Sequence, residues 1–167
     1  FGGYGKISMV QAFVFSPNPA FAKTIHNGYK SNPERFVNRF NRMGLNQKLG
    51  LQIKGEGEPI IRNHRDQGWS GVSLAWMSHG YEVALTPLQT LAFYNAIANN
   101  GELLRPRLIR EVKEWDRTIA KFDKEVLNPE ICSPETVAKV KQLLRNVVLK
   151  ENGTGHRLNT THLALAG

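Results

Sequence analysis

The triplet Ser16-Pro17-Asn18 constrains the fold most, because it interrupts an apolar stretch that otherwise has the composition of a continuous helix. Ser8 is a helix-capping residue type and predicts a short helix that runs to Phe15. Pro17 and Pro19 lack the N–H group that a continuing helix would use, so the first helix must stop there. Asn18 then predicts a new N-cap, with Pro19 at the first helical position of a second helix that ends near Gly28. We therefore expect two helices joined at a polar break.

Three further helix starts share one pattern, a polar capping residue followed directly by proline. The three pairs are Asn32-Pro33, Thr86-Pro87 and Ser133-Pro134. Glycine predicts the end of the first of these helices near Gly44, and the end of the second at Asn99-Asn100-Gly101. The third carries apolar residues along one face at three- and four-residue spacings, as an amphipathic helix does.

The segments outside these helices predict little regular structure. Glycines and mixed charges between residues 51 and 78 favour a looped or extended excursion with short strands at best. Residues 107–115 and 118–122 flank the turn Asp116-Arg117 and predict a β-hairpin. The apolar segment Thr161–Gly167 predicts a strand that begins where the chain stops, and the Ala166-Gly167 end indicates that the rest of a longer domain follows.

Composition is that of a globular domain, with 41% hydrophobic and 22% charged residues among 167. The net charge of +8 is spread among interleaved acids, which favours a solvated surface and leaves open a non-enzymatic module that binds an anionic polymer. The single cysteine, Cys132, excludes an intrachain disulfide and is expected to pack rather than to act as a nucleophile. The histidines show no metal-ligand spacing, and no cofactor or metal is predicted.

The side chains of Ser16 and Asn18 carry groups suited to catalysis at such a break. A hydroxyl can relay a proton, and a carboxamide can both donate and accept hydrogen bonds toward a peptide. The same residue types also form ordinary turns between helices, so the triplet alone leaves both interpretations open.

The order of motifs along the chain resembles the transpeptidase domain of class B penicillin-binding proteins, whose pattern reads Ser-x-x-Lys, Ser-x-Asn and Lys-Thr-Gly. The matching segments of this chain, in order, are Ser16-x-Asn18, Gly80-Tyr81, Thr86-Pro87-Leu88-Gln89, Ala98-Asn99-Asn100-Gly101, Arg105-Pro106, Val147-Val148, Gly153-Thr154-Gly155 and Ala166-Gly167. The resemblance covers nearly the whole chain.

The resemblance implies a peptidoglycan D,D-transpeptidase, in which a serine attacks the penultimate D-alanine of a stem peptide and forms an acyl-enzyme. A neighbouring amine then displaces the enzyme and forms the cross-link, and β-lactams react as mimics of the D-alanyl-D-alanine end. By this resemblance Ser16 passes a proton toward the leaving amine, while Asn18 hydrogen-bonds the catalytic lysine and the substrate. Tyr81 and His79 match positions that line the substrate cleft, although ordinary packing of Tyr81 remains open.

Two of the three catalytic motifs are absent from this sequence. None of its serines is followed three residues later by lysine, and Lys-Thr-Gly does not occur. Pro17 and Pro19-Ala20 depart from the family pattern around the asparagine, and Glu82 stands where glycine is common. We therefore expect residues 1–167 to be one partial transpeptidase domain that is inert by itself.

The expected fold is α+β: a mainly helical fragment of a penicillin-binding-protein/serine β-lactamase-like domain, with a small β-hairpin and most of the central antiparallel sheet missing. An uncovered apolar face would favour self-association. The resemblance implies stem peptides, β-lactams and other cell-wall synthesis proteins as partners of the parent protein, and no nucleic acid. It also implies the extracytoplasmic face of the bacterial inner membrane, with an anchor upstream. A serine β-lactamase or a penicillin-sensor domain, which share the motif order, remain alternatives.

Overall fold

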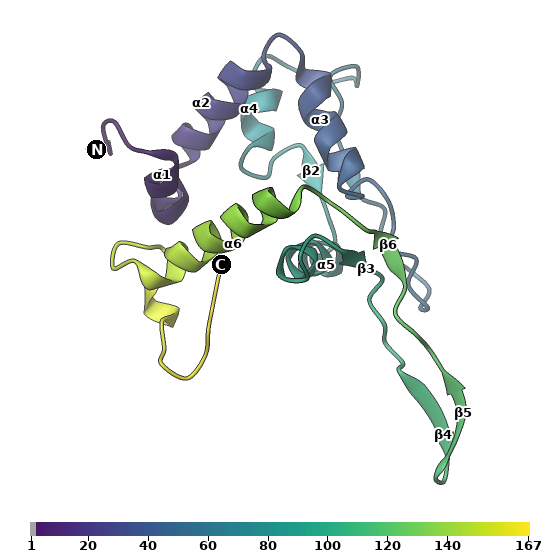
Figure 1. Cartoon of the computed structure of the whole chain (residues 1–167). Helices are drawn as coiled ribbons and strands as arrows, with labels where there is room; N and C mark the ends of the chain where they lie inside the picture. The colour runs from purple at the N-terminus through teal and green to yellow at the C-terminus, as the bar shows by residue number, and fades with distance from the viewer. Residues whose placement is uncertain (1–2) are drawn as a thin grey trace.

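Helices dominate the computed structural model, which describes residues 3–167 (Figure 1). The α-helices are α1 (Met9–Phe15), α2 (Asn18–Tyr29), α3 (Pro33–Arg42), α4 (Ser73–Met77), α5 (Pro87–Ala98) and α6 (Pro134–Leu149), and a 3₁₀ turn, η1, covers His156–Leu158. The strands are β1 (Ile60–Ile61), β2 (Val83–Ala84), β3 (Leu103–Leu104), β4 (Glu111–Glu114), β5 (Arg117–Lys121) and β6 (Val126–Asn128). The expectation of a mainly helical α+β chain is confirmed.

The helix starts follow from local capping chemistry. Ser8 and Thr86 each form a capping box, in which the hydroxyl accepts from the third residue of the helix and a glutamine side chain returns to the cap N–H. Asn32 and Ser133 accept through their side chains from the third backbone N–H of α3 and α6. These four groups satisfy N–H donors that have no partner inside their helices, so the predicted starts are confirmed.

The break between α1 and α2 differs in one detail from the prediction. Pro17, in an extended conformation, is the N-cap of α2, and Asn18 is already its first helical residue, so the prediction of Asn18 as N-cap was wrong. The reason is that Ser16, the C-cap of α1, takes a left-handed conformation (φ 52°). The chain therefore leaves the path of α1 at Ser16, and α2 begins one residue earlier than predicted. Pro19 then occupies the second helical position. Backbone N–H groups in the first turn have no acceptor within the helix, so the absence of an N–H at Pro19 costs no helical hydrogen bond.

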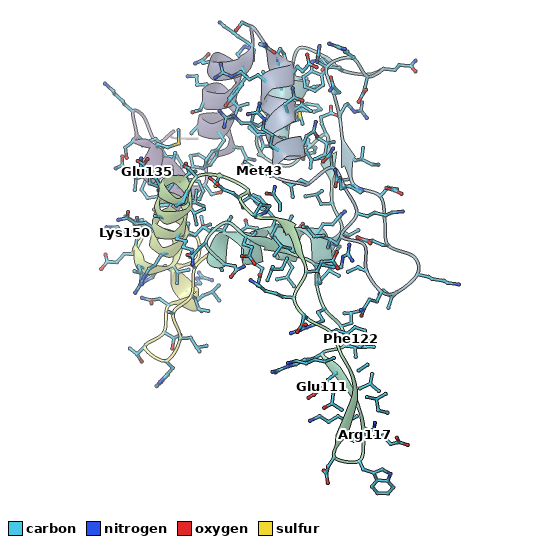
Figure 2. The ribbon with its side chains drawn as sticks, turned by 45° about the vertical axis from the view of Figure 1, so that its right-hand side comes forward. Met43, Glu111, Arg117, Phe122, Glu135 and Lys150 are labelled. Carbon is cyan, nitrogen blue, oxygen red and sulfur yellow. The ribbon has the colours of Figure 1, made fainter. Side chains whose placement is uncertain are left out.

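Strands occur in short antiparallel pairs, each of two strands: β1 with β2, β3 with β6, and β4 with β5. The predicted hairpin is confirmed as β4–β5, but β4 is shorter than expected, and β5 keeps its predicted length while starting one residue earlier. The turn is therefore Trp115-Asp116 rather than Asp116-Arg117, with Trp115 at φ 54°. This hairpin projects away from the helices (Figure 1), and the segment from Glu111 to Phe122 carries side chains into solvent on both faces (Figure 2).

Three elements differ from the sequence-based expectation. The short helix α4 falls within the segment expected to be looped, and the β3–β6 pair was not predicted. The segment Thr161–Gly167 forms no strand; it runs back along α6, where the Gly167 N–H donates to the Leu144 carbonyl (3.2 Å). Within residues 3–167 no strand lies beside this segment, and an extended chain without a neighbouring strand cannot pair its backbone groups.

The main core lies where α5 meets the β3–β6 pair. Its buried members are small or branched apolar residues: Leu49, Ala92, Ala96, Ile97, Leu103 and Ile131. A second contact joins α1 to α6, and a third joins α2 to α4. Other apolar side chains of α5, among them Leu91 and Tyr94, remain exposed to solvent. The candidate site is therefore held by the packing of α1 and α2 against two different helices.

Candidate active site

The proline break places Ser16 and Asn18 at the surface between two helices. The N–H of Ser16 donates to the Ala12 carbonyl (2.9 Å) and closes α1, while Asn18 opens α2. Both side chains are exposed, and neither forms a hydrogen bond with another of the residues described here. A hydroxyl and a carboxamide two residues apart are therefore free to engage a ligand.

A turn that follows α6 fixes the end of α1 just before this break. The Thr154 N–H donates to the Val14 carbonyl (3.2 Å), and the Gly155 N–H donates to the Val147 carbonyl (3.2 Å). Gly153 passes so close to α6 that a Cβ atom there would lie 2.1 Å from the Val147 carbonyl oxygen. Only glycine fits this approach, so the Gly153-Thr154-Gly155 turn ties α1 to the C-terminal end of α6.

Helix α4 packs against α2, so the second pair of expected site residues follows a helix that contacts the helix begun by Asn18. Asn18 begins α2, and His79 and Tyr81 follow directly after α4 (Figure 1). Within residues 3–167 no hydrogen bond joins either of these aromatic residues to Ser16 or Asn18. Their roles as catalytic and substrate-binding groups therefore stay predictions.

Tyr81 belongs to a small aromatic cluster on the surface. Its ring lies 5.7 Å from that of Trp76 and 5.5 Å from that of His79, the latter in an edge-to-face arrangement. The Tyr81 side chain remains 62% exposed, so it is not an ordinary core residue. The His79 Nδ1 also lies 3.2 Å from the Ser78 hydroxyl oxygen. Aromatic rings held in this way offer a stacking surface for a ligand.

An acidic residue that the sequence did not assign to the site anchors this cluster. The Glu82 carboxylate pairs with Arg62 (Nε–Oε2, 2.8 Å) and accepts a hydrogen bond from the buried Ser73 hydroxyl (3.2 Å). Glu82 drew attention in the sequence only as a departure from glycine, and nothing in the sequence marked Arg62 or Ser73.

The largest cavity described, about 570 Å³, lies apart from these residues. Helices α1, α3, α5 and α6 line it with mainly apolar side chains, and Cys132 is at its wall. Burial, together with the charge of Glu130, raises the pKa of the Cys132 thiol, so the reactive thiolate is disfavoured, as expected for a packing residue. Among residues 3–167, no cluster of three or more His, Cys, Asp or Glu side chains is arranged to hold a metal ion.

The model of the penicillin binding protein transpeptidase domain matches residues 2–167. The penicillin-binding protein PbpB of Mycolicibacterium smegmatis is 30% identical over 143 residues, which are 81% of this chain and 21% of that protein. The imipenem acyl-enzyme complex of penicillin-binding protein A from M. tuberculosis superposes with a TM-score of 0.70 at 26% identity, over 87% of this chain and 32% of the other. A peptidoglycan glycosyltransferase structure from Burkholderia ambifaria shares the fold, with a TM-score of 0.77 at 21% identity, over 99% of this chain and 48% of the other.

The chain therefore belongs to the penicillin-binding protein transpeptidase family, of the class B type that its sequence resembles. It spans about a fifth of the length of the curated relatives it matches. No helix among the described residues combines the length and the apolar character needed to cross a bilayer.

Proposed function

We propose that this chain is part of a serine-type peptidoglycan D,D-transpeptidase and supplies the Ser-x-Asn element of its active site. The observation that carries the proposal is the exposed pair Ser16 and Asn18 at a proline break, in a chain that matches the transpeptidase model over residues 2–167. Relatives named as peptidoglycan D,D-transpeptidases support the reaction class.

In this reaction a serine outside the chain attacks the penultimate carbonyl carbon of a stem peptide, and the C–N bond to the terminal D-alanine breaks. The leaving nitrogen needs a proton, and the Ser16 hydroxyl is suited to pass it one through a short hydrogen-bonded relay. The Asn18 carboxamide can accept from the catalytic lysine while donating to the substrate peptide. An amine from a second stem then attacks the ester, the cross-linking amide forms, and the serine is released.

Tyr81 and His79 are proposed to line the substrate cleft. The exposure of the Tyr81 ring and its packing against two other rings support this role. Aromatic faces bury the apolar parts of a stem peptide without needing a charged partner.

The parent protein is proposed to act in the bacterial cell envelope, at the extracytoplasmic face of the inner membrane, with its anchor upstream of residues 1–167. Stem peptides, β-lactams and other cell-wall synthesis proteins are its proposed partners. Self-association of residues 1–167 remains a proposal that the exposed apolar side chains of α5 support.

Labelling with fluorescent penicillin tests the proposal. The full-length protein should become covalently labelled, whereas residues 1–167 alone should not, because they contain no Ser-x-x-Lys. In the full-length protein Ser16→Ala and Asn18→Ala should each lower the acylation rate by about 10²-fold or more. Asn38→Ala, an exposed asparagine on α3, is the matched control and should acylate at the wild-type rate. Labelling of the isolated chain, or normal rates in both site variants, would overturn the assignment. Rapid release of the label would favour a β-lactamase instead.

A further inference from the structure

Two residues with positive φ angles bracket Tyr81. Gly80 has φ 101° and Glu82 has φ 61°. Glycine adopts such a conformation freely, whereas glutamate pays a steric penalty in the left-handed region. A non-glycine residue keeps this conformation only where the surrounding structure enforces it. The position of Glu82 therefore calls for a compensating interaction.

The Glu82 side chain provides that interaction on both of its carboxylate oxygens. Oε2 pairs with the Arg62 guanidinium at 2.8 Å, and Oε1 accepts from the Ser73 hydroxyl at 3.2 Å. The Glu82 side chain is only 14% exposed and the Arg62 side chain 38%, so solvent screens the ion pair only in part. The Glu82 carbonyl also accepts from the Arg62 N–H at 3.0 Å, where the chain leaves β1.

These contacts connect the aromatic cluster to rigid structure on both sides. Ser73 is the first residue of α4, and the Ser70 N–H donates to its hydroxyl (3.0 Å). Trp76 lies one turn further along α4, and its carbonyl accepts from the Tyr81 N–H (3.2 Å). Holding Glu82 against Ser73 and Arg62 thus fixes the backbone on which Tyr81 is displayed.

We propose that Glu82 is a positioning residue for substrate recognition, which holds Tyr81 and His79 in place for the stem peptide through the Arg62 ion pair and the Ser73 hydrogen bond. The inference rests on the proposed function of the chain, because it concerns how the same cleft binds its peptide substrate. Glu82 itself is expected to make no contact with the substrate.

The test compares Glu82→Gly, Tyr81→Ala and the double variant in the full-length protein, with a D-alanyl donor peptide as substrate. Glycine relieves the backbone strain, so this variant removes the anchor without forcing a new conformation. We expect Glu82→Gly to raise KM about tenfold with kcat nearly unchanged. The double variant should lose less than the product of the two single effects, because both changes act in large part through the Tyr81 ring. Glu82→Gln, which keeps one acceptor oxygen, should recover part of the loss.

Nuclear magnetic resonance of labelled tyrosine rings gives a readout that needs no activity. The ring signals of Tyr81 should move toward those of a free tyrosine in Glu82→Gly, because the neighbouring rings of Trp76 and His79 no longer shift them. Unchanged Tyr81 signals in Glu82→Gly would overturn the role of Glu82 in holding Tyr81, whatever KM and kcat are measured for that variant. A raised KM in Tyr81→Ala alone, with Glu82→Gly at wild-type KM, would overturn the inference and leave the proposed function intact. Wild-type KM in Tyr81→Ala would overturn both the inference and the substrate role of Tyr81.

Discussion

The Glu56 carboxylate holds together a loop on which the main core depends, and its removal gives a sharp test of the physical reasoning. Oε1 accepts from the Leu49 N–H (2.5 Å), and Oε2 accepts from the N–H groups of Gly50 (2.9 Å) and Leu51 (3.0 Å). Leu49 is buried in the core beside α5. Substitution Glu56→Gln keeps the size of the side chain but replaces one oxygen by an NH₂ group, which faces a backbone N–H whichever way the amide turns.

The magnitude follows from these contacts. At least one backbone donor loses its acceptor, and an unsatisfied buried donor costs about 1–3 kcal/mol. Partial exposure of the loop lowers the figure to about 1–2 kcal/mol. The Leu49, Gly50 and Leu51 amides should therefore exchange with solvent about 5- to 30-fold faster in Glu56→Gln at pH 7.

The pH dependence has a definite sign. Desolvation opposes ionisation of Glu56, but the N–H groups of Leu51, Leu49 and Gly50, assisted by the charge of Lys48, outweigh it and hold the pKa of the carboxyl below its ordinary value. A depressed pKa gives stability that is present above the unfolded pKa and is lost as pH falls through the folded pKa. The protection lost in Glu56→Gln should thus be largest near pH 7 and shrink in acid.

Hydrogen exchange at single amides measures this effect, with protection factors compared at neutral and acid pH. Glu58→Gln is the matched control, because Glu58 is an exposed acid two residues away that pairs only with Lys48 among the described residues. It should leave the three amides unchanged. Equal protection in Glu56→Gln and wild type at pH 7, or the same loss at both pH values, would refute the reasoning.

Two other substitutions test the fold, one at a tightly packed position and one at an almost fully exposed position. Gly153→Ala should lower the melting temperature and cost about 1–3 kcal/mol, since its Cβ would meet the Val147 carbonyl oxygen; unchanged thermal unfolding would show that the turn does not hold α1 against α6. Trp115→Ser should change stability by less than about 0.5 kcal/mol, because the ring at the tip of the β4–β5 hairpin is 95% exposed; a large loss in a melting curve would mean that the hairpin packs against another part of the protein.

Local chemistry explains which parts of the fold the sequence predicted. Ser8, Asn32, Thr86 and Ser133 cap their helices through contacts only three residues away, so the signal and its partner lie side by side in the chain. The β4–β5 hairpin was predictable for the same reason, because its strands are joined by a tight turn.

Contacts between distant segments explain the failures. Leu103 pairs with Asn128, which lies 25 positions further along the chain. No sequence pattern within either segment predicts that the two segments pair. The segment Thr161–Gly167 has the composition of a strand, but composition does not supply a neighbour to pair with.

The site shows the same division between local and distant contacts. Ser16 and Asn18 stood out because polar residues and prolines interrupt an apolar run, which the sequence displays directly. Glu82 was visible only as an unexpected glutamate, since its partner Arg62 lies twenty positions earlier and approaches through the β1–β2 pair.

The central claim is that the Ser16 hydroxyl and the Asn18 carboxamide face the reacting peptide. The most direct measurement is a crystal structure of the full-length protein acylated by a β-lactam. Both side chains should lie within hydrogen-bonding distance of the acyl group or of the lysine beside it. The account would be contradicted if the α1–α2 break were turned away from the ligand, with the Ser16 and Asn18 side chains both beyond hydrogen-bonding distance of the acyl group and of the lysine.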